Sequence, residues 1–135
     1  MNFMFLAVAL ITAFIYTETA PTGWEVFLDH IKEGSDFVGD YIVCEERDVP
    51  IGDLYYKKHD NETIEITAFQ VDRDRRREGV GTALLKYLIN TIARNGHFKK
   101  VKLDVSNAGK KEAAMGIYKS VGFKVVGGNL MELKL

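Results

Sequence analysis

The stretch VDRDRRREGVGT, residues 71–82, decides how this sequence is to be read. It follows a strand-like run, and an apolar helical pattern begins within it. The first N–H groups of a helix have no carbonyl partners and lie at the positive end of the helix dipole. Gly79 and Gly81 leave room for a phosphate beside these groups, and the preceding arginines add charged donors. The stretch therefore predicts a pyrophosphate-binding loop.

The helix that begins in this loop is expected to cover residues 79–94. Val80, Leu84, Leu88 and Ile92 recur every fourth residue, which is typical of a helix with one face on a core. The loop lacks the Gly-Lys-Ser/Thr ending of the nucleotide-binding P-loop and the GxGxxG spacing of dinucleotide-binding folds. These two classes of phosphate site are excluded.

Periodicity and turn residues predict the remaining elements. Ile64, Ile66 and Ala68 are expected on one face of a strand, and Glu65, Thr67, Phe69 and Val71 on the other. A turn is expected at 48–50 and a closing hairpin around 127–129. The order predicts an α/β fold with a mixed sheet flanked by helices. The expected ranges are helix 23–32, strands 41–44, 51–58 and 64–71, helix 79–94, strand 100–105, helix 111–121, and strands 123–126 and 130–135.

The bulk properties fit a single domain over residues 1–135. Residues 1–63 carry twelve acidic and four basic residues, whereas residues 64–135 carry seven acidic and fourteen basic ones. This division suggests two ligands of opposite charge. No nucleic-acid recognition element stands out, so a small phosphate-bearing cofactor fits better. The single cysteine, Cys44, and three scattered histidines offer neither a disulfide nor a metal-binding pattern.

The phosphate loop and a second motif resemble the GNAT superfamily of N-acetyltransferases. Residues 76–81, RREGVG, match the family's Gln/Arg-x-x-Gly-x-Gly/Ala signature, and residues 114–123, AMGIYKSVGF, match its A-x-x-L-Y-x-x-x-G-F pattern. The likeness is good over about 64–126. It implies the GNAT fold, a mostly antiparallel mixed sheet flanked by helices with a C-terminal hairpin. Where the family has Gly or a basic residue, this sequence has Arg77 and Glu78.

The resemblance implies acetyl-coenzyme A as the co-substrate and no metal. The pantetheine arm would pair as an extra strand with the backbones of Phe69 and Val71. The pyrophosphate would receive the N–H groups of residues 79–82 and the side chains of two arginines. Asn107 would contact pantetheine, because Lys111 stands where the family's asparagine is usual. The implied cofactor-binding residues are Phe69, Val71, Arg76, Arg77, Gly79, Val80, Gly81, Thr82 and Asn107.

Tyr118 and Glu65 are the catalytic candidates that the resemblance provides. Tyr118 would protonate the departing thiolate, for which a phenol has a suitable pKa. Glu65 precedes Gly79 by fourteen residues, the spacing of the catalytic glutamate in histone-type members. Partial desolvation would raise its pKa and make it a base for the acceptor amine, unless water molecules serve instead. A backbone N–H near Val71 would polarise the thioester carbonyl, and Cys44 is not proposed as a nucleophile.

The acidic N-terminal half predicts a cationic primary amine as acceptor, such as a polyamine, an aminoglycoside, or a lysine or N-terminus in a basic peptide. One alternative is a GNAT-like module that binds coenzyme A without catalysis. Another is a membrane-tethered interaction protein, because residues 3–16 are apolar except for Thr12. That run is more typical of a buried first element than of a membrane span. A cytoplasmic location is expected, and a homodimer is left open.

Overall fold

The fold is taken from a computed structural model, which describes residues 23–106, 108 and 111–135. The apolar run at 3–16 and the proposed pantetheine contact Asn107 therefore lie outside the described residues. Among the described residues, no helix has the length and apolar character needed to cross a membrane.

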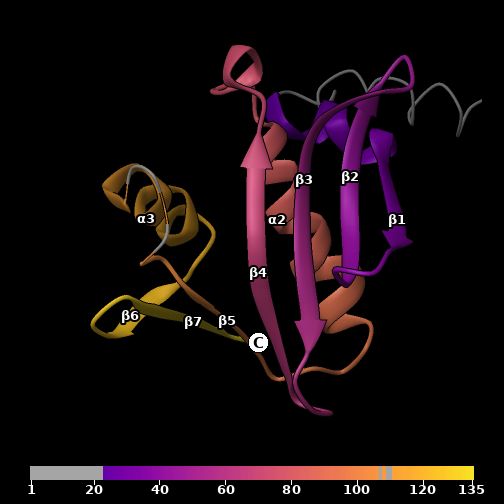
Figure 1. Cartoon of the computed structure of the whole chain (residues 1–135). Coiled ribbons are helices and arrows are strands. Elements are labelled where there is room, and N and C mark those ends of the chain that lie inside the picture. Colours follow the sequence, from indigo (N-terminus) through magenta and orange to yellow (C-terminus); the bar gives the residue numbers. More distant parts are fainter. Residues whose placement is uncertain (1–22, 107, 109–110) are drawn as a thin grey trace, which may run out of the picture.

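The described chain forms one seven-stranded sheet in the order β1-β2-β3-β4-β5-β7-β6. The β4–β5 pair is parallel and every other pair is antiparallel. Figure 1 shows α2 behind the strands β2–β4 and α3 beside the C-terminal hairpin. The predicted mixed sheet flanked by helices is confirmed. The elements are η1 Gly23–His30, β1 Ile31–Ser35, β2 Asp40–Glu46, β3 Val49–Lys58, β4 Thr63–Val71, η2 Arg73–Arg75, α2 Val80–Tyr87, η3 Leu88–Arg94, β5 Lys100–Asp104, α3 Lys111–Ser120, β6 Lys124–Gly127 and β7 Leu130–Lys134.

The N-terminal elements differ from expectation in two respects. The predicted helix at 23–32 is a 3₁₀ helix that ends at His30, and Ile31 begins strand β1 instead. Ile31 pairs with Cys44 and Lys32 with Val43, so backbone pairing with β2 determines their conformation. The turn that follows β2 is at Arg47 and Asp48, which both have positive φ, rather than at 48–50.

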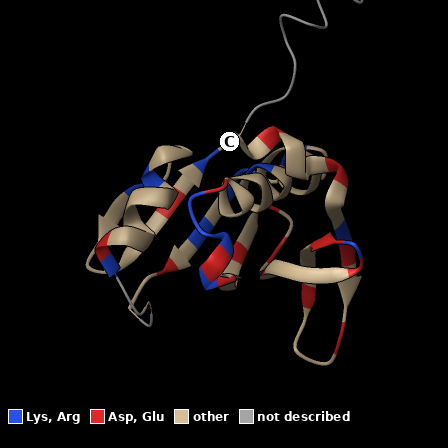
Figure 2. Cartoon of the chain, turned by 90° about the horizontal axis from the view of Figure 1, so that it is seen from above, with Lys and Arg blue, Asp and Glu red and all other residues tan. Residues whose placement is uncertain are grey.

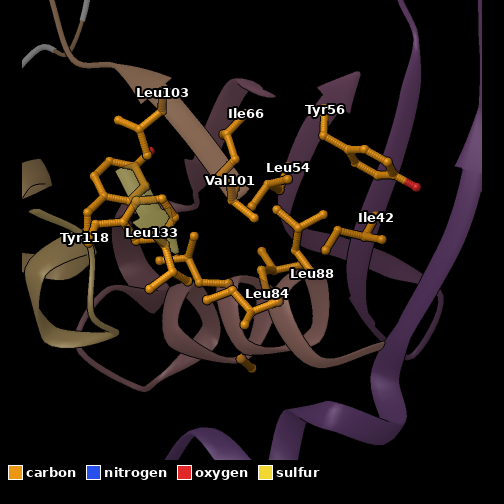
Figure 3. Packing of buried hydrophobic residues seen from close by; sticks show 14 of the residues in the cluster. Ile42, Leu54, Tyr56, Ile66, Leu84, Leu88, Val101, Leu103, Tyr118 and Leu133 are labelled. Atoms are coloured by element: carbon orange, nitrogen blue, oxygen red, sulfur yellow. The ribbon is translucent and has the colours of Figure 1, made fainter. Parts of the chain in front are cut away.

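The predicted long helix is present but changes its winding. Residues Val80–Tyr87 form an α-helix, and Leu88–Arg94 continue it as wider π turns, which nothing in the local sequence explains. The apolar row lies against the sheet as expected. Figure 3 shows Leu84 and Leu88 packed beneath Leu54, Ile66 and Val101.

Strand β4 departs from simple alternation because it contains a β-bulge. Tyr55 pairs with Ala68 and Tyr56 with Ile66, so Thr67 is an extra residue with no partner on β3. The bulge moves Phe69 and Val71 to the α2 side of the sheet, where they join Ile64 and Ile66. The expected placement of Phe69 and Val71 opposite Ile64 was therefore wrong, because the extra residue reverses the alternation beyond it.

Leu84 tests how α2 is anchored. Its side chain has no exposed surface and lies close to Gly52 of β3. We expect Leu84→Ala to lower the free energy of unfolding by about 2–5 kcal/mol, because the substitution leaves a cavity between helix and sheet. Urea denaturation measures the change. Leu130→Ala, at a half-exposed position, is the control and should cost less than about 1 kcal/mol. Equal losses in the two variants would contradict this packing.

Candidate acetyl-donor site

The candidate site begins where β4 and β5 separate. The two strands are paired from Thr63 and Lys100 as far as Ile66 and Leu103. The bulged residue Thr67 comes next, and from there to Val71 β4 is paired only with β3. A bulge bends its strand and increases the local twist, which accounts for the separation at this residue. The upper half of β4 therefore has one edge without a neighbouring strand.

The open edge presents the backbone groups of Phe69 and Val71. Asp72 donates its N–H to the carbonyl of Ile51 on β3 at 2.9 Å. Backbone groups alternate in direction along a strand, so those of Val71 and Phe69 point away from β3. In agreement, Nε of Arg76 donates to the carbonyl oxygen of Val71 at 3.2 Å. The two residues predicted to pair with pantetheine are the two whose backbones face the open edge.

The loop after β4 leads directly into the start of α2. Gly79 precedes the helix with a φ of 103°, and no side chain caps the helix at this position. The first helical hydrogen bond runs from the N–H of Ala83 to the carbonyl of Gly79 at 2.9 Å. The N–H groups of Val80, Gly81 and Thr82 therefore have no carbonyl of their own helix to bond. Such groups favour an anion.

The arginines of the loop differ in their exposure and in their hydrogen-bond partners. Arg75 is half-buried and donates to both carboxylate oxygens of Glu46, at 2.7 and 3.0 Å, and through Nε to Glu78 at 2.9 Å. This ion pair fastens the loop to β2, and the Arg75 hydrogen bond lowers the pKa of Glu46. Arg76 and Arg77 are exposed and available to a ligand. Figure 2 shows the loop with its arginines in blue, from above this end of the sheet.

Glu78 stood out in the sequence as an acid within a phosphate site. Its carboxylate is held by Arg75, so its charge is paired within the loop. The motif that predicted the loop gave no sign of this second function for Arg75. An arginine four residues before the first glycine, with an acid next to that glycine, is the only signal that could have suggested it.

The absence of a side chain at Gly79 and Gly81 matters for packing as well as for ligand binding. A Cβ on Gly79 would lie 2.7 Å from backbone atoms of Trp24 in η1. A Cβ on Gly81 would lie 3.2 Å from the ring of Phe69. The first glycine thus allows η1 to cross the start of α2, and the second brings the helix close to the open edge of β4.

Tyr118 lies on the same side of the sheet as α2. Its ring centroid is 5.8 Å from that of Phe69 and 5.6 Å from that of Phe123, and 7% of its surface is exposed. Figure 3 shows it beside Leu103 and Leu133. Burial raises the pKa of the Tyr118 phenol to about 12. The pKa of the Tyr118 phenol is therefore further above that of a thiol than the sequence suggested.

Glu65 lies on the opposite face of β4, one residue before the last pair with β5. Its Oε1 contacts Nε2 of His59, and Nζ of Lys57 lies 3.7 Å away. The His59 hydrogen bond, with the positive charges of Lys57 and Lys102, lowers the pKa of Glu65 despite partial burial. The expectation of a raised pKa was therefore wrong. His59, which sequence reasoning passed over as one of three scattered histidines, is part of this group.

Two further observations concern the single cysteine and the absence of a metal site in the described ranges. Cys44 is buried in β2, and burial raises its pKa to about 11, which suits a packing residue. Over the described ranges, no three His, Cys, Asp or Glu side chains come together as metal ligands would.

With this arrangement described, the chain can be compared with known proteins. The family model described as "Acetyltransferase (GNAT) family" matches residues 6–123. The chain belongs to the GNAT family.

One relative is similar in sequence, and two solved structures are similar in fold. "Probable N-acetyltransferase 14" of Xenopus tropicalis is 41% identical over 69 residues, which are 51% of this chain and 32% of that protein. The match thus spans about a third of the relative's length. The structure of Ard1 from Thermoplasma volcanium has a TM-score of 0.64 and 23% identity, with 73% of this chain and 72% of that one covered. A GNAT acetyltransferase from Elizabethkingia anophelis with acetyl-CoA bound has a TM-score of 0.62 and 20% identity, covering 82% and 80%.

The crossing of η1 over Gly79 gives this GNAT chain a testable constraint. Gly79→Ala places a Cβ against the Trp24 backbone at a positive φ, so we expect a loss of more than about 2 kcal/mol in unfolding free energy. Gly116→Ala is the matched control. It lies within α3 with no atom near the added Cβ, and we expect a gain of about 0.5–1 kcal/mol. Thermal and urea denaturation of both variants check this. Unchanged stability of Gly79→Ala would contradict the close approach.

Proposed function

We propose that this chain transfers the acetyl group of acetyl-CoA to a primary amine by direct attack in a ternary complex. The observation that carries the proposal is the continuity of two features. The open edge of β4 at Phe69 and Val71 leads to the free N–H groups at the start of α2. An extended pantetheine arm joined to a pyrophosphate has the same sequence of chemical groups. Family membership and the N-acetyltransferase relative support the same reaction.

The donor would be held by groups of three kinds. The backbones of Phe69 and Val71 would pair with the amide groups of pantetheine. The N–H groups of residues 79–82 would bind the pyrophosphate, with Arg76 and Arg77 as charged partners. Arg76, which now contacts the Val71 carbonyl, lies where the arm would pass into the pyrophosphate. Asn107 and Thr82 are proposed as further contacts.

The two catalytic candidates lie on opposite sides of the sheet: Glu65 is on β4 two residues before the bulge at Thr67, and Tyr118 is on α3. Glu65 faces away from α2, whereas Tyr118 lies on the α2 side next to Phe69. A thioester placed along the edge would have a base on the side of the amine and an acid on the side of the sulfur. A backbone N–H near Val71 would polarise the carbonyl. Most of the rate would come from this alignment of the reactants.

Tyr118 would act on the departing sulfur as a protonated phenol. A phenol with a pKa near 12 is about three units above a thiol, so complete transfer to a thiolate costs about 4 kcal/mol. The cost disappears if the amine nitrogen returns a proton to the phenol as the phenol gives its own to sulfur. Tyr118 then passes a proton from the nitrogen to the sulfur, and its phenol is protonated both before and after the transfer.

Replacement of Tyr118 separates an enzyme from a module that only binds coenzyme A. We expect Tyr118→Phe to lower kcat by about 100-fold, because the sulfur loses its proton donor, while the Kd for coenzyme A changes less than twofold. Thiol release and calorimetry measure the two quantities. Tyr87→Phe is the matched control, since its hydroxyl contacts Glu33 of β1. Coenzyme A binding without turnover by the unmodified chain would favour the inactive module.

The acceptor is proposed to be a cationic amine because of the acidic N-terminal half. In the structure several of these acids serve the fold: Tyr55 contacts Asp36, Lys32 contacts Glu45 and Arg75 contacts Glu46. They belong to β1, β2 and the turn between them, with β3 separating them from β4. Their combined negative charge can still attract a cation at long range. We also propose a cytoplasmic location, which requires an acceptor that is present in that compartment.

A second acceptor class is favoured by the lysines near Glu65. Lys57 and Lys102 add positive charge at the place where an amine would lose its proton. An acceptor with a carboxylate close to its amine would pair with them, whereas a polycation would be repelled.

A panel of acceptors distinguishes these classes. The acidic half predicts that spermidine and a lysine-rich peptide give a higher kcat/KM than glutamate or an acidic peptide. The reverse order would contradict the cationic acceptor. In that case Lys57→Gln should raise KM for the acidic amine several-fold, because a charged partner is lost. Initial rates of thiol release over the panel give the answer.

A further inference from the structure

The sheet face opposite α2 carries two tyrosines that lie side by side. Leu54 of β3 is buried on the α2 side, so its neighbours Asp53 and Tyr55 point to the other face. Tyr41 of β2 pairs with Tyr55 and shares this face, and the centroids of the two rings are 5.3 Å apart. In Figure 1 the face is turned toward the reader, with α2 behind the strands. Both tyrosines are half-buried, so a ligand can reach them from this side.

Both rings are held in place without a ligand. The ring of Tyr41 lies over Gly34 of β1, where a Cβ would overlap Cζ of the tyrosine. The hydroxyl of Tyr55 donates to Oδ2 of Asp36 at 2.8 Å, and Oδ1 of Asp36 accepts the N–H of Val38 at 2.8 Å. A strand glycine and a hydrogen-bonded turn thus fix the aromatic pair. Groups that are ordered in advance lose less conformational entropy when a ligand binds.

Asp53 lies beside this pair, and its carboxylate lacks a partner. It precedes Tyr55 by two residues on β3 and therefore shares its face. Oδ1 of Asp53 is buried and has no hydrogen-bond partner. It forms no ion pair with another described residue. Burial, with the negative charge of Asp72, raises the pKa of Asp53. A cation bound here would compensate a charge that the fold leaves unpaired.

The two basic side chains that β1–β4 place on this face have carboxylates of their own. Nζ of Lys32 lies 2.8 Å from Oε1 of Glu45, and Nζ of Lys57 lies 3.7 Å from Oε1 of Glu65. Neither lysine is paired with Asp53, so its charge is left for a ligand. Asp53 is half-buried as a whole residue, so its carboxylate can be approached from the open side of the sheet.

One small residue separates the tyrosines from the open edge of β4. Tyr55 pairs with Ala68, which is exposed and follows the bulge at Thr67. Beyond Ala68 no strand is paired with this part of β4. Adjacent strands are about 4.8 Å apart, so Tyr55 lies about one strand and Tyr41 about two strands from this edge. A cation bound at the tyrosines would therefore lie about 5–10 Å from an amine that attacks a thioester at the edge.

We propose that Tyr41, Tyr55 and Asp53 bind a second cationic group of the acceptor, an inference that rests on the proposed acetyl transfer. The faces of the two rings attract an ammonium group, and the carboxylate neutralises its charge. The acceptor is then a primary amine with another ammonium group a short aliphatic chain away, as in a diamine or a polyamine.

The site is tested with two acceptors that differ by one ammonium group, 1,4-diaminobutane and 1-aminobutane, each with acetyl-CoA. We expect kcat/KM for the diamine to be about 10-fold or more above that for the monoamine. Asp53→Asn should lower this ratio at least about fivefold, while kcat/KM for 1-aminobutane stays within about twofold, because only the second cation loses its partner. Initial rates of thiol release measure both values.

Asp29→Asn is the matched control, since it removes the same charge from an exposed position in η1. The ratio of the two acceptors should be unchanged in this variant. Equal ratios in the unmodified chain and Asp53→Asn would overturn the site. An equal decrease in Asp53→Asn and Asp29→Asn would also overturn it, because the effect would then be the general charge of the N-terminal half.

A titration of the chain with 1,4-diaminobutane alone, followed by NMR of the backbone amides, tests binding without turnover. Shifts should centre on Tyr41, Asp53 and Tyr55, and Asp53→Asn should raise the Kd about 10-fold. The urea midpoint of Asp53→Asn should be unchanged or higher, because the variant removes a buried charge that has no partner. A lower midpoint would show that the carboxylate serves the fold, and would contradict the site.

Failure of the site and failure of acetyl transfer give different results. Turnover of both amines with equal kcat/KM contradicts the site alone. An absence of turnover with either amine contradicts the proposed acetyl transfer, and the NMR titration then decides the site: shifts away from Tyr41, Asp53 and Tyr55, or none, would overturn it.

Discussion

The separation of β4 from β5 after the Ile66–Leu103 pair is the constraint on which the rest of the structure depends. Sheet strands normally satisfy the backbone groups of both neighbours, and an edge left open in the middle of a sheet has unpaired donors and acceptors. Here the bulge at Thr67 turns the upper half of β4 away from β5. The resulting gap in pairing gives a second extended chain a place to bind, and it is continuous with the anion-binding start of α2.

The second requirement is that the basic loop keep a fixed path between β4 and α2. Arg75 supplies it by bonding Glu46 of β2 and Glu78 within the loop. Gly79 also fixes this path, because its lack of a side chain lets η1 pack across the start of α2. The neighbouring Arg76 and Arg77 are thereby left on the surface for a ligand. One sequence run thus contains both the residues that fix the loop and those available for binding.

The sequence predicted the features that depend on local pattern and missed those that depend on pairing between strands. The glycines before the apolar row of α2 predicted the loop, and the family motif predicted that Phe69 and Val71 would face a ligand. Ile31 fitted a helical row but pairs with β2 instead. The bulge at Thr67 and the contact of His59 with Glu65 arise only when β3 lies against β4. No periodicity within one strand reports such a contact.

The account is tested most directly by amide hydrogen exchange with and without coenzyme A, followed residue by residue by NMR. Binding at the open edge should slow exchange at Phe69 and Val71 and at the helix start, residues 80–82, while Gly81→Glu abolishes the effect. Protection confined to another surface would contradict the account.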